Sequence, residues 1–65
     1  MQMFVIRLET GEYVTNCRIT KSYLDYERTL HRVGADTFND LDVQAVIKRL
    51  ARLGQKAKPE EACQL

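Results

Sequence analysis

The sequence predicts a small α+β domain, in which one amphipathic helix packs against a short antiparallel sheet. Residues near the N-terminus alternate as in strands, a later segment repeats its apolar residues at helical spacing, and the chain has only 65 residues. A chain of this size buries roughly 60% of the surface that its unfolded form exposes, so its stability is marginal. We expect a single domain over residues 1–56 and a flexible C-terminal tail over residues 57–65.

The first two predicted strands form an N-terminal β-hairpin. Between residues 3 and 10, Phe4, Ile6 and Leu8 fall on one face and Arg7 and Glu9 on the other, as in a half-buried strand. Gly11 tolerates the positive φ that a tight turn requires. Alternation after the turn predicts one shared face for Tyr13, Thr15, Cys17 and Ile19. Because two strands alone are seldom stable in water, the hairpin requires a further layer.

Residues 22–33 fit two alternatives. Helical spacing relates Tyr23, Tyr26, Leu30 and Val33. Leu24, Tyr26 and Leu30 also suit the alternation of a strand. We favour a third antiparallel strand, because two helices on a lone hairpin would leave more of the sheet edge uncovered.

The best-marked element is a helix that begins after Asn39 and ends before Gly54. Asn39 is a good N-cap, and Asp42 occupies the third helical position, from which its side chain can reach back. Phe38 and Val43 occupy the two positions of a hydrophobic staple. One apolar stripe is predicted to contain Val43, Val46, Ile47, Leu50 and Leu53. Gly54 then suits the position that follows a helix.

The far side of the same helix is basic. It is predicted to carry Lys48, Arg49, Arg52 and Lys56. Asp40 and Asp42 lie in the first turn, so anions come first and cations last, as the helix dipole favours. Any solvated helix that ends in glycine would place its cations there, with or without a ligand. These four cations are nevertheless the candidate partner-binding residues.

Composition and charge exclude several classes of protein. The formal net charge is +1, and both signs are spread along the chain, so no global field attracts a polyanion. No apolar run approaches about 18 residues and no signal-peptide core is present, so we expect a soluble cytoplasmic protein without a membrane partner. Cys17 and Cys63 form no CxxC motif. We expect reduced thiols, with Cys17 in the core and Cys63 in the tail, and a redox role of either stays open.

The residues of common catalytic and metal sites are not assembled in this sequence. His31 is the only histidine, and the 3 glycines form no phosphate-binding array. The spacing of Asp36, Asp40 and Asp42 is not that of a calcium loop. We therefore expect no catalytic, cofactor or metal site, and a protein that is not an enzyme.

The order FVIRLETGEYV and GADTFNDLDVQAVIKRLARLG resembles short ββ(β)α accessory proteins of phages and prophages, mostly of unknown function. The likeness covers Phe4 to Gly54 and depends on Gly11 to Val14, Ala35 to Phe38, and Leu53-Gly54. Some such proteins inhibit host machinery or bacterial defence, so the resemblance implies a module that occupies a partner's surface in the host cytoplasm. Members of this group often continue with a strand after Leu-Gly, whereas the charged, proline-bearing segment here predicts none.

Three functions follow from these observations. The leading hypothesis is a non-enzymatic protein-binding module, an accessory or inhibitor protein of the phage type. The second is a small nucleic-acid-binding regulator, which would use Arg49, Arg52, Lys56 and Lys58, aided by Arg28, Arg32 or the tyrosines. The third is a structural homodimer, because an exposed sheet edge can pair across a two-fold axis.

Overall fold

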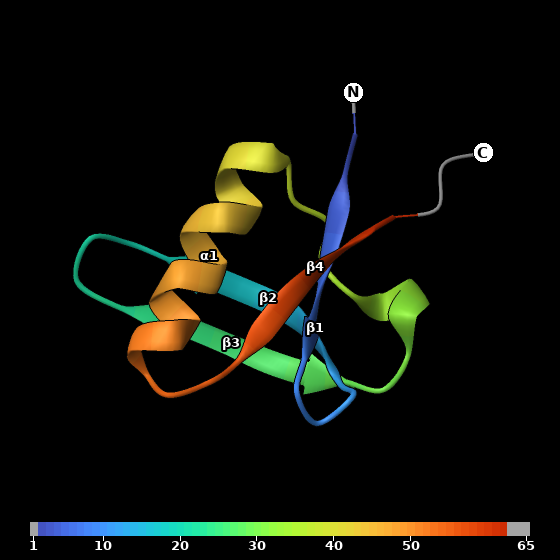
Figure 1. Cartoon of the computed structure of the whole chain (residues 1–65), viewed down its shortest axis with the longest axis horizontal. Helices are drawn as coiled ribbons and strands as arrows, with labels where there is room; N and C mark the ends of the chain where they lie inside the picture. The colour runs from blue at the N-terminus through green and yellow to red at the C-terminus, as the bar shows by residue number, and fades with distance from the viewer. Residues whose placement is uncertain (1, 63–65) are drawn as a thin grey trace.

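The computed structural model describes residues 2–62 and contains one helix packed on a four-stranded antiparallel sheet (Figure 1). In chain order the elements are β1 (Phe4–Leu8), β2 (Tyr13–Ile19), β3 (Leu24–Thr29), the 3₁₀ helix η1 (Arg32–Gly34), α1 (Asp40–Arg52) and β4 (Ala57–Glu61). The strand order is β3-β2-β1-β4. The α+β fold and the third strand are thereby confirmed. No helix within residues 2–62 is long and apolar enough to cross a membrane.

β4 corrects the prediction that residues 57–65 are a flexible tail. It pairs antiparallel with all of β1, from Leu8↔Ala57 to Phe4↔Glu61. A proline is compatible with this strand, because β4 is an edge and pairs on one side only. The pairing uses the backbone and needs no apolar alternation, which is why the sequence pattern did not predict it. Residues 63–65, including Cys63, lie outside the described part of the chain.

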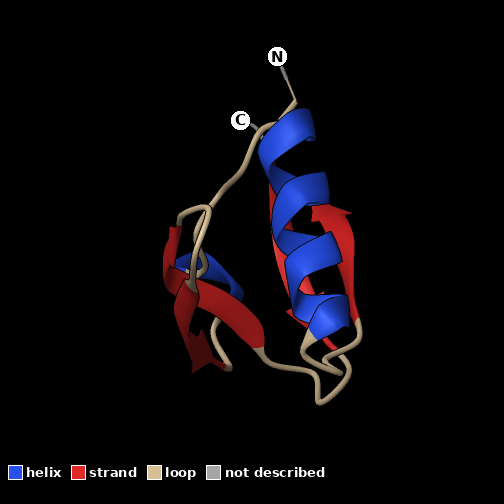
Figure 2. Ribbon diagram, turned by 90° about the vertical axis from the view of Figure 1, so that its left-hand side faces the viewer, coloured by secondary structure: helices blue, strands red, loops and turns tan. Residues whose placement is uncertain are grey.

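β1 and β2 pair beside their connecting turn, where Arg7 and Tyr13 are register partners, and then diverge. The segment after η1 fills the space between them. On one side Phe38 exchanges two backbone hydrogen bonds of 2.8 Å with Phe4, and on the other the Asp36 amide donates to the Val14 carbonyl at 3.0 Å. The sheet is therefore two ribbons joined at one corner, and β2 and β3 cross behind α1 (Figures 1 and 2). We call residues 35–38 the wedge segment.

A β-bulge corrects the predicted inward face of β2. The prediction grouped Tyr13, Thr15, Cys17 and Ile19. The structure instead buries Val14 completely, and the pairing register shifts farther along β2, where Asn16 has a φ of 49°. The bulge inserts one extra residue, so Cys17 packs against the core although Val14, three positions earlier, does so too. Of the four residues predicted to face inward, Cys17 packs against the core, whereas Ile19 is 38% exposed.

The core lies between α1 and the sheet. Its buried members are Ile6, Leu8, Val14, Val43, Val46 and Leu50. The predicted N-cap is confirmed, because the Asn39 side chain accepts a 2.8 Å hydrogen bond from the Asp42 amide. Gly54 has a φ of +81°, as expected just beyond a helix. Leu53, however, is 67% exposed, because the helix ends at Arg52 and no longer holds this side chain on the apolar stripe.

Candidate functional site

The four predicted partner-binding cations do not form one patch. Lys48 and Arg52 are exposed on α1. Arg49 is partly buried, and its guanidinium donates a 2.7 Å hydrogen bond to the Thr20 carbonyl, which ties α1 to the β2–β3 turn. Lys56 lies beyond Gly54 and approaches β1 instead, since its carbonyl accepts from the Glu9 amide at 3.1 Å. The cations are therefore divided between solvent, a structural contact and a different surface.

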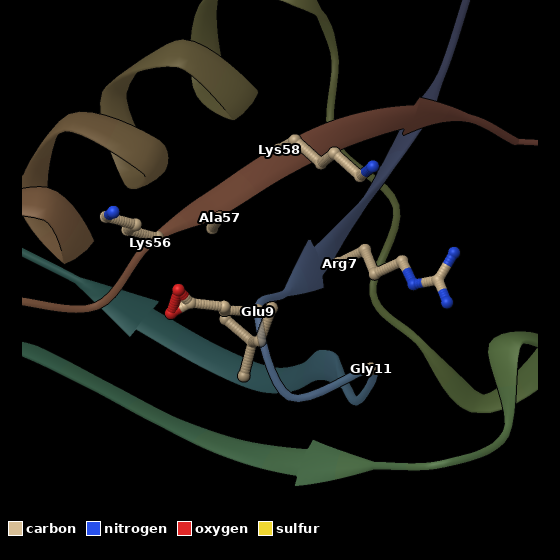
Figure 3. A pocket seen from close by; sticks show the side chains of 7 residues that line it. Arg7, Glu9, Gly11, Lys56, Ala57 and Lys58 are labelled. Carbon is tan, nitrogen blue, oxygen red and sulfur yellow. The ribbon is translucent and has the colours of Figure 1, made fainter.

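That surface is a hollow of about 420 Å³ beside the paired ends of β1 and β4 (Figure 3). It is lined by Arg7, Leu8, Glu9, Gly11, Lys56, Ala57 and Lys58. Arg7 and Lys58 are direct register partners, and Figure 3 shows both side chains extending toward the same end of the hollow. Lys56 and Glu9 extend toward the other end. We call this surface the basic hollow.

One carboxylate near the basic hollow balances two arginines. Glu60 lies 3.2 Å from Arg7 and 3.2 Å from Arg32, and it accepts a 3.4 Å hydrogen bond from the Tyr13 hydroxyl. A guanidinium nitrogen of Arg32 also donates to the Glu61 carbonyl. These bonds fasten η1 to β4. No carboxylate oxygen of the described residues lies within 4.0 Å of the Nζ atom of Lys56 or Lys58.

The two edges of the sheet differ in how they are protected. β4 carries Pro59 and Lys58, residues that discourage the addition of another strand. β3 contains neither proline nor lysine, and within residues 2–62 only β2 pairs with it. Asp25 and Glu27 point to one face of β3. On the other face Arg28 lies 5.7 Å from the centroid of the Tyr26 ring.

Exposed apolar side chains lie near both ends of β3. Val33 is 98% exposed and Leu30 74% exposed, and both follow the C-terminal end of the strand. Tyr23 is 50% exposed and Ile19 38% exposed near its N-terminal end. Single exposed apolar residues are ordinary, and these four lie as two pairs, one at each end of the edge strand β3. We call β3 with these residues the β3 edge.

The other candidates for a chemical role are a metal site, His31 and Cys17. No group of three or more His, Cys, Asp or Glu side chains within residues 2–62 could hold a metal ion. His31 is exposed. Burial, followed by the charges of Asp36 and Asp25, raises the pKa of the Cys17 thiol above its ordinary value.

Sequence reasoning missed both surfaces as sites. Strand alternation did place Arg7 outside the core, but nothing in the sequence identified Lys58 as its neighbour, because β4 was not predicted. The third strand was predicted without its place in the sheet, and only the strand order makes it an edge. The chain matches no protein-family model, and no curated protein or solved structure shows significant similarity to it.

Proposed function

We propose that this chain is a small non-enzymatic protein-binding module that binds an extended segment of a partner protein along the β3 edge. The observation that carries the proposal is an edge strand of six residues without proline or lysine, beside exposed apolar side chains. Added strands gain affinity from backbone hydrogen bonds and specificity from alternate side chains. A cytoplasmic accessory or inhibitor protein of the phage type would act in this way, by occupying a surface of a host or defence protein.

The charges of β3 indicate the chemistry of the partner segment. Asp25 and Glu27 lie two residues apart on the same face, where alternate residues of an added strand would face them. Oppositely charged cross-strand pairs stabilise a sheet, so the favoured segment carries lysine or arginine at alternate positions. Val33 and Leu30 provide an apolar contact just beyond the strand.

A second copy of this chain fits the β3 edge poorly. If two β3 strands pair antiparallel about a two-fold axis at Glu27, this residue faces its own copy. If the axis lies at Tyr26, Asp25 of one copy faces Glu27 of the other. Like charges that are directly opposite destabilise a sheet, so these central registers disfavour the homodimer and favour a basic partner.

The nucleic-acid alternative has less support, because several of its cations already have partners. Arg49 binds the Thr20 carbonyl, Arg32 binds Glu60, and Arg28 lies over the Tyr26 ring. Phosphates would also meet Asp25 and Glu27 along β3. Of the cations that remain, Arg52 is exposed on α1, whereas Lys56 and Lys58 line the basic hollow, so they do not form one backbone-tracking groove.

The test uses two synthetic peptides of about seven residues, one alternating lysine with valine and one alternating glutamate with valine. We expect the lysine peptide to shift the amide resonances of residues 24–29 in a ¹⁵N-labelled sample. The double variant Asp25→Asn/Glu27→Gln should weaken binding by about 2- to 30-fold, if each exposed charge pair contributes about 0.2–1 kcal/mol.

The matched control is Asp40→Asn/Asp42→Asn, which removes the same charge from exposed positions at the start of α1. It should bind the lysine peptide as wild type does. Equally weakened peptide binding in both double variants would show that only the net charge of the protein determines the affinity. Equal binding of both peptides, or shifts outside the β3 edge, would refute the proposal. Salt-sensitive binding of DNA or RNA duplexes in a mobility-shift assay would promote the nucleic-acid alternative.

A further inference from the structure

The pairing of β1 with β4 brings two like charges together. Arg7 and Lys58 are register partners in an antiparallel pair, so both side chains lie on the same face of the sheet. Directly opposite like charges destabilise a sheet. Glu60 offsets part of this repulsion, since it lies 3.2 Å from Arg7, but the same carboxylate also lies 3.2 Å from Arg32. Arg7 and Arg32 thus share one carboxylate on this face, and Lys58 has no ion-pair partner among the described residues.

The excess of positive charge lies beside open space. The basic hollow has a volume of about 420 Å³ and Arg7 and Lys58 both line it. Gly11, at another part of its lining, has no atom within 4 Å of the position that a Cβ would occupy. Figure 3 shows the Arg7 and Lys58 side chains at one end, with no carboxylate of the labelled residues between them. An anion can therefore approach both cations from solvent.

We propose that the basic hollow binds a small phosphate monoester, with its phosphate between Arg7 and Lys58. A guanidinium binds two phosphate oxygens at once, and an ammonium adds a compact second charge. A dianion matches the excess of two positive charges in the lining, where the three cations Arg7, Lys56 and Lys58 face the one carboxylate of Glu9. This site is separate from the β3 edge, and neither proposal depends on the other.

The ligand is small because carboxylates lie at the borders of the site. Glu9 lines the hollow, and Glu60 lies beside Arg7, so a second phosphate of a polymer would meet negative charge on either side. Ligand pockets of proteins have volumes of roughly 300 Å³ or more. The volume of the basic hollow exceeds this value, so an organic group can enter it together with the phosphate. The aliphatic stems of Arg7, Lys56 and Lys58 provide apolar lining for that group, because the side chains of Leu8 and Ala57 face the core.

The experiment is an NMR titration of the full chain with phenyl phosphate, at constant ionic strength maintained with chloride. We expect saturable shifts at Arg7, Gly11 and Lys58. Lys58→Gln should weaken binding at least fivefold, whereas Lys48→Gln, the same change on exposed α1, should leave it within twofold of wild type. Arg7→Gln should weaken binding similarly, and its circular dichroism must match wild type, since this variant also loses a contact to Glu60.

Two further ligands distinguish the sources of phosphate. Inorganic phosphate should bind the same residues more weakly than phenyl phosphate, because it leaves the apolar lining empty. Equal affinity would overturn the assignment to a monoester and leave a site for a bare anion. An oligothymidylate that binds more tightly as its length increases would overturn the small-ligand proposal. Identical losses in Lys58→Gln and Lys48→Gln, or the same shifts with chloride alone, would refute the site.

Discussion

The backbone amide of Cys17 donates a 2.8 Å hydrogen bond to the carboxylate of Asp36. This bond joins the bulge in β2 to the wedge segment, whose Asp36 amide also donates to the Val14 carbonyl at 3.0 Å. Asp36 therefore fixes the place where β1 and β2 diverge, and it puts a negative charge beside the Cys17 thiol. Both consequences can be measured through that thiol.

We predict that Cys17 reacts slowly with iodoacetamide in a Cys63→Ser background. Burial is the main cause that raises the pKa of Cys17, and Asp36 and Asp25 add to it, so less thiolate is present at a given pH. The rate should therefore rise at a more alkaline pH than in the urea-unfolded chain. Asp36→Asn keeps an acceptor oxygen but removes the charge. It should shift the pH profile of the reaction rate part of the way towards that of the unfolded chain. An unchanged profile would exclude the charge of Asp36 as a cause.

The same shift affects stability. Because the pKa of Cys17 is higher in the folded chain than in the unfolded chain, the thiol's contribution is fully present below the unfolded-state pKa. It is lost as pH rises through the folded-state pKa. The free energy of unfolding should therefore fall in the alkaline range in this background, and Cys17→Ala should reduce the slope.

The two ends of the predicted apolar stripe should respond differently to truncation. Leu50 is fully buried in the core, so Leu50→Ala should cost about 2–5 kcal/mol and unfold much of the population at room temperature. Leu53 is 67% exposed, so Leu53→Ala should change the free energy of unfolding by about 0.5 kcal/mol or less. Urea denaturation followed by circular dichroism measures both. Similar losses for the two variants would contradict the end of α1 at Arg52.

Local signals in the sequence predicted the elements that depend on local interactions. Asn39 and Gly54 define the ends of α1 through a cap and a positive φ, and both effects act within one helical turn. The alternation of Phe4, Ile6 and Leu8 likewise predicted β1 correctly. These signals do not require knowledge of any distant residue.

The features that were missed depend on distant pairing. β4 forms because its backbone meets β1, about 50 residues away in the sequence, and Ala57 is the one small apolar residue that faces the core. The bulge at Asn16 is held by Asp36, and Arg49 is held by Thr20. The basic hollow follows from the pairing of β1 with β4, so a prediction without β4 could not locate it.

Removal of residues 59–65 should destabilise the fold, contrary to the expectation for a tail. The deletion eliminates three of the five register pairs between β1 and β4, those of Pro59, Glu60 and Glu61. It also removes the carboxylate that binds Arg7 and Arg32. We expect loss of a cooperative thermal transition and increased binding of a hydrophobic dye, because one side of β1 becomes exposed. A cooperative transition within a few degrees of wild type would show that β4 adds little stability.

Substitutions of Arg49 and Arg52 should distinguish a cation that makes a structural contact from one that is solvated. Arg49→Gln loses the 2.7 Å hydrogen bond to the Thr20 carbonyl, because glutamine is shorter, and we expect a cost of about 0.5–1.5 kcal/mol. Arg52→Gln removes the same charge from the same end of α1, so it is the control for the lost interaction with the helix dipole. It should lower the free energy of unfolding by less than Arg49→Gln does. Amide hydrogen exchange at Thr20 provides a local readout. Its amide donates to the Tyr23 carbonyl at 2.8 Å, and exchange should accelerate in Arg49→Gln but not in Arg52→Gln. Equal acceleration in the two variants would mean that charge, and not the contact with Thr20, stabilises the turn between β2 and β3.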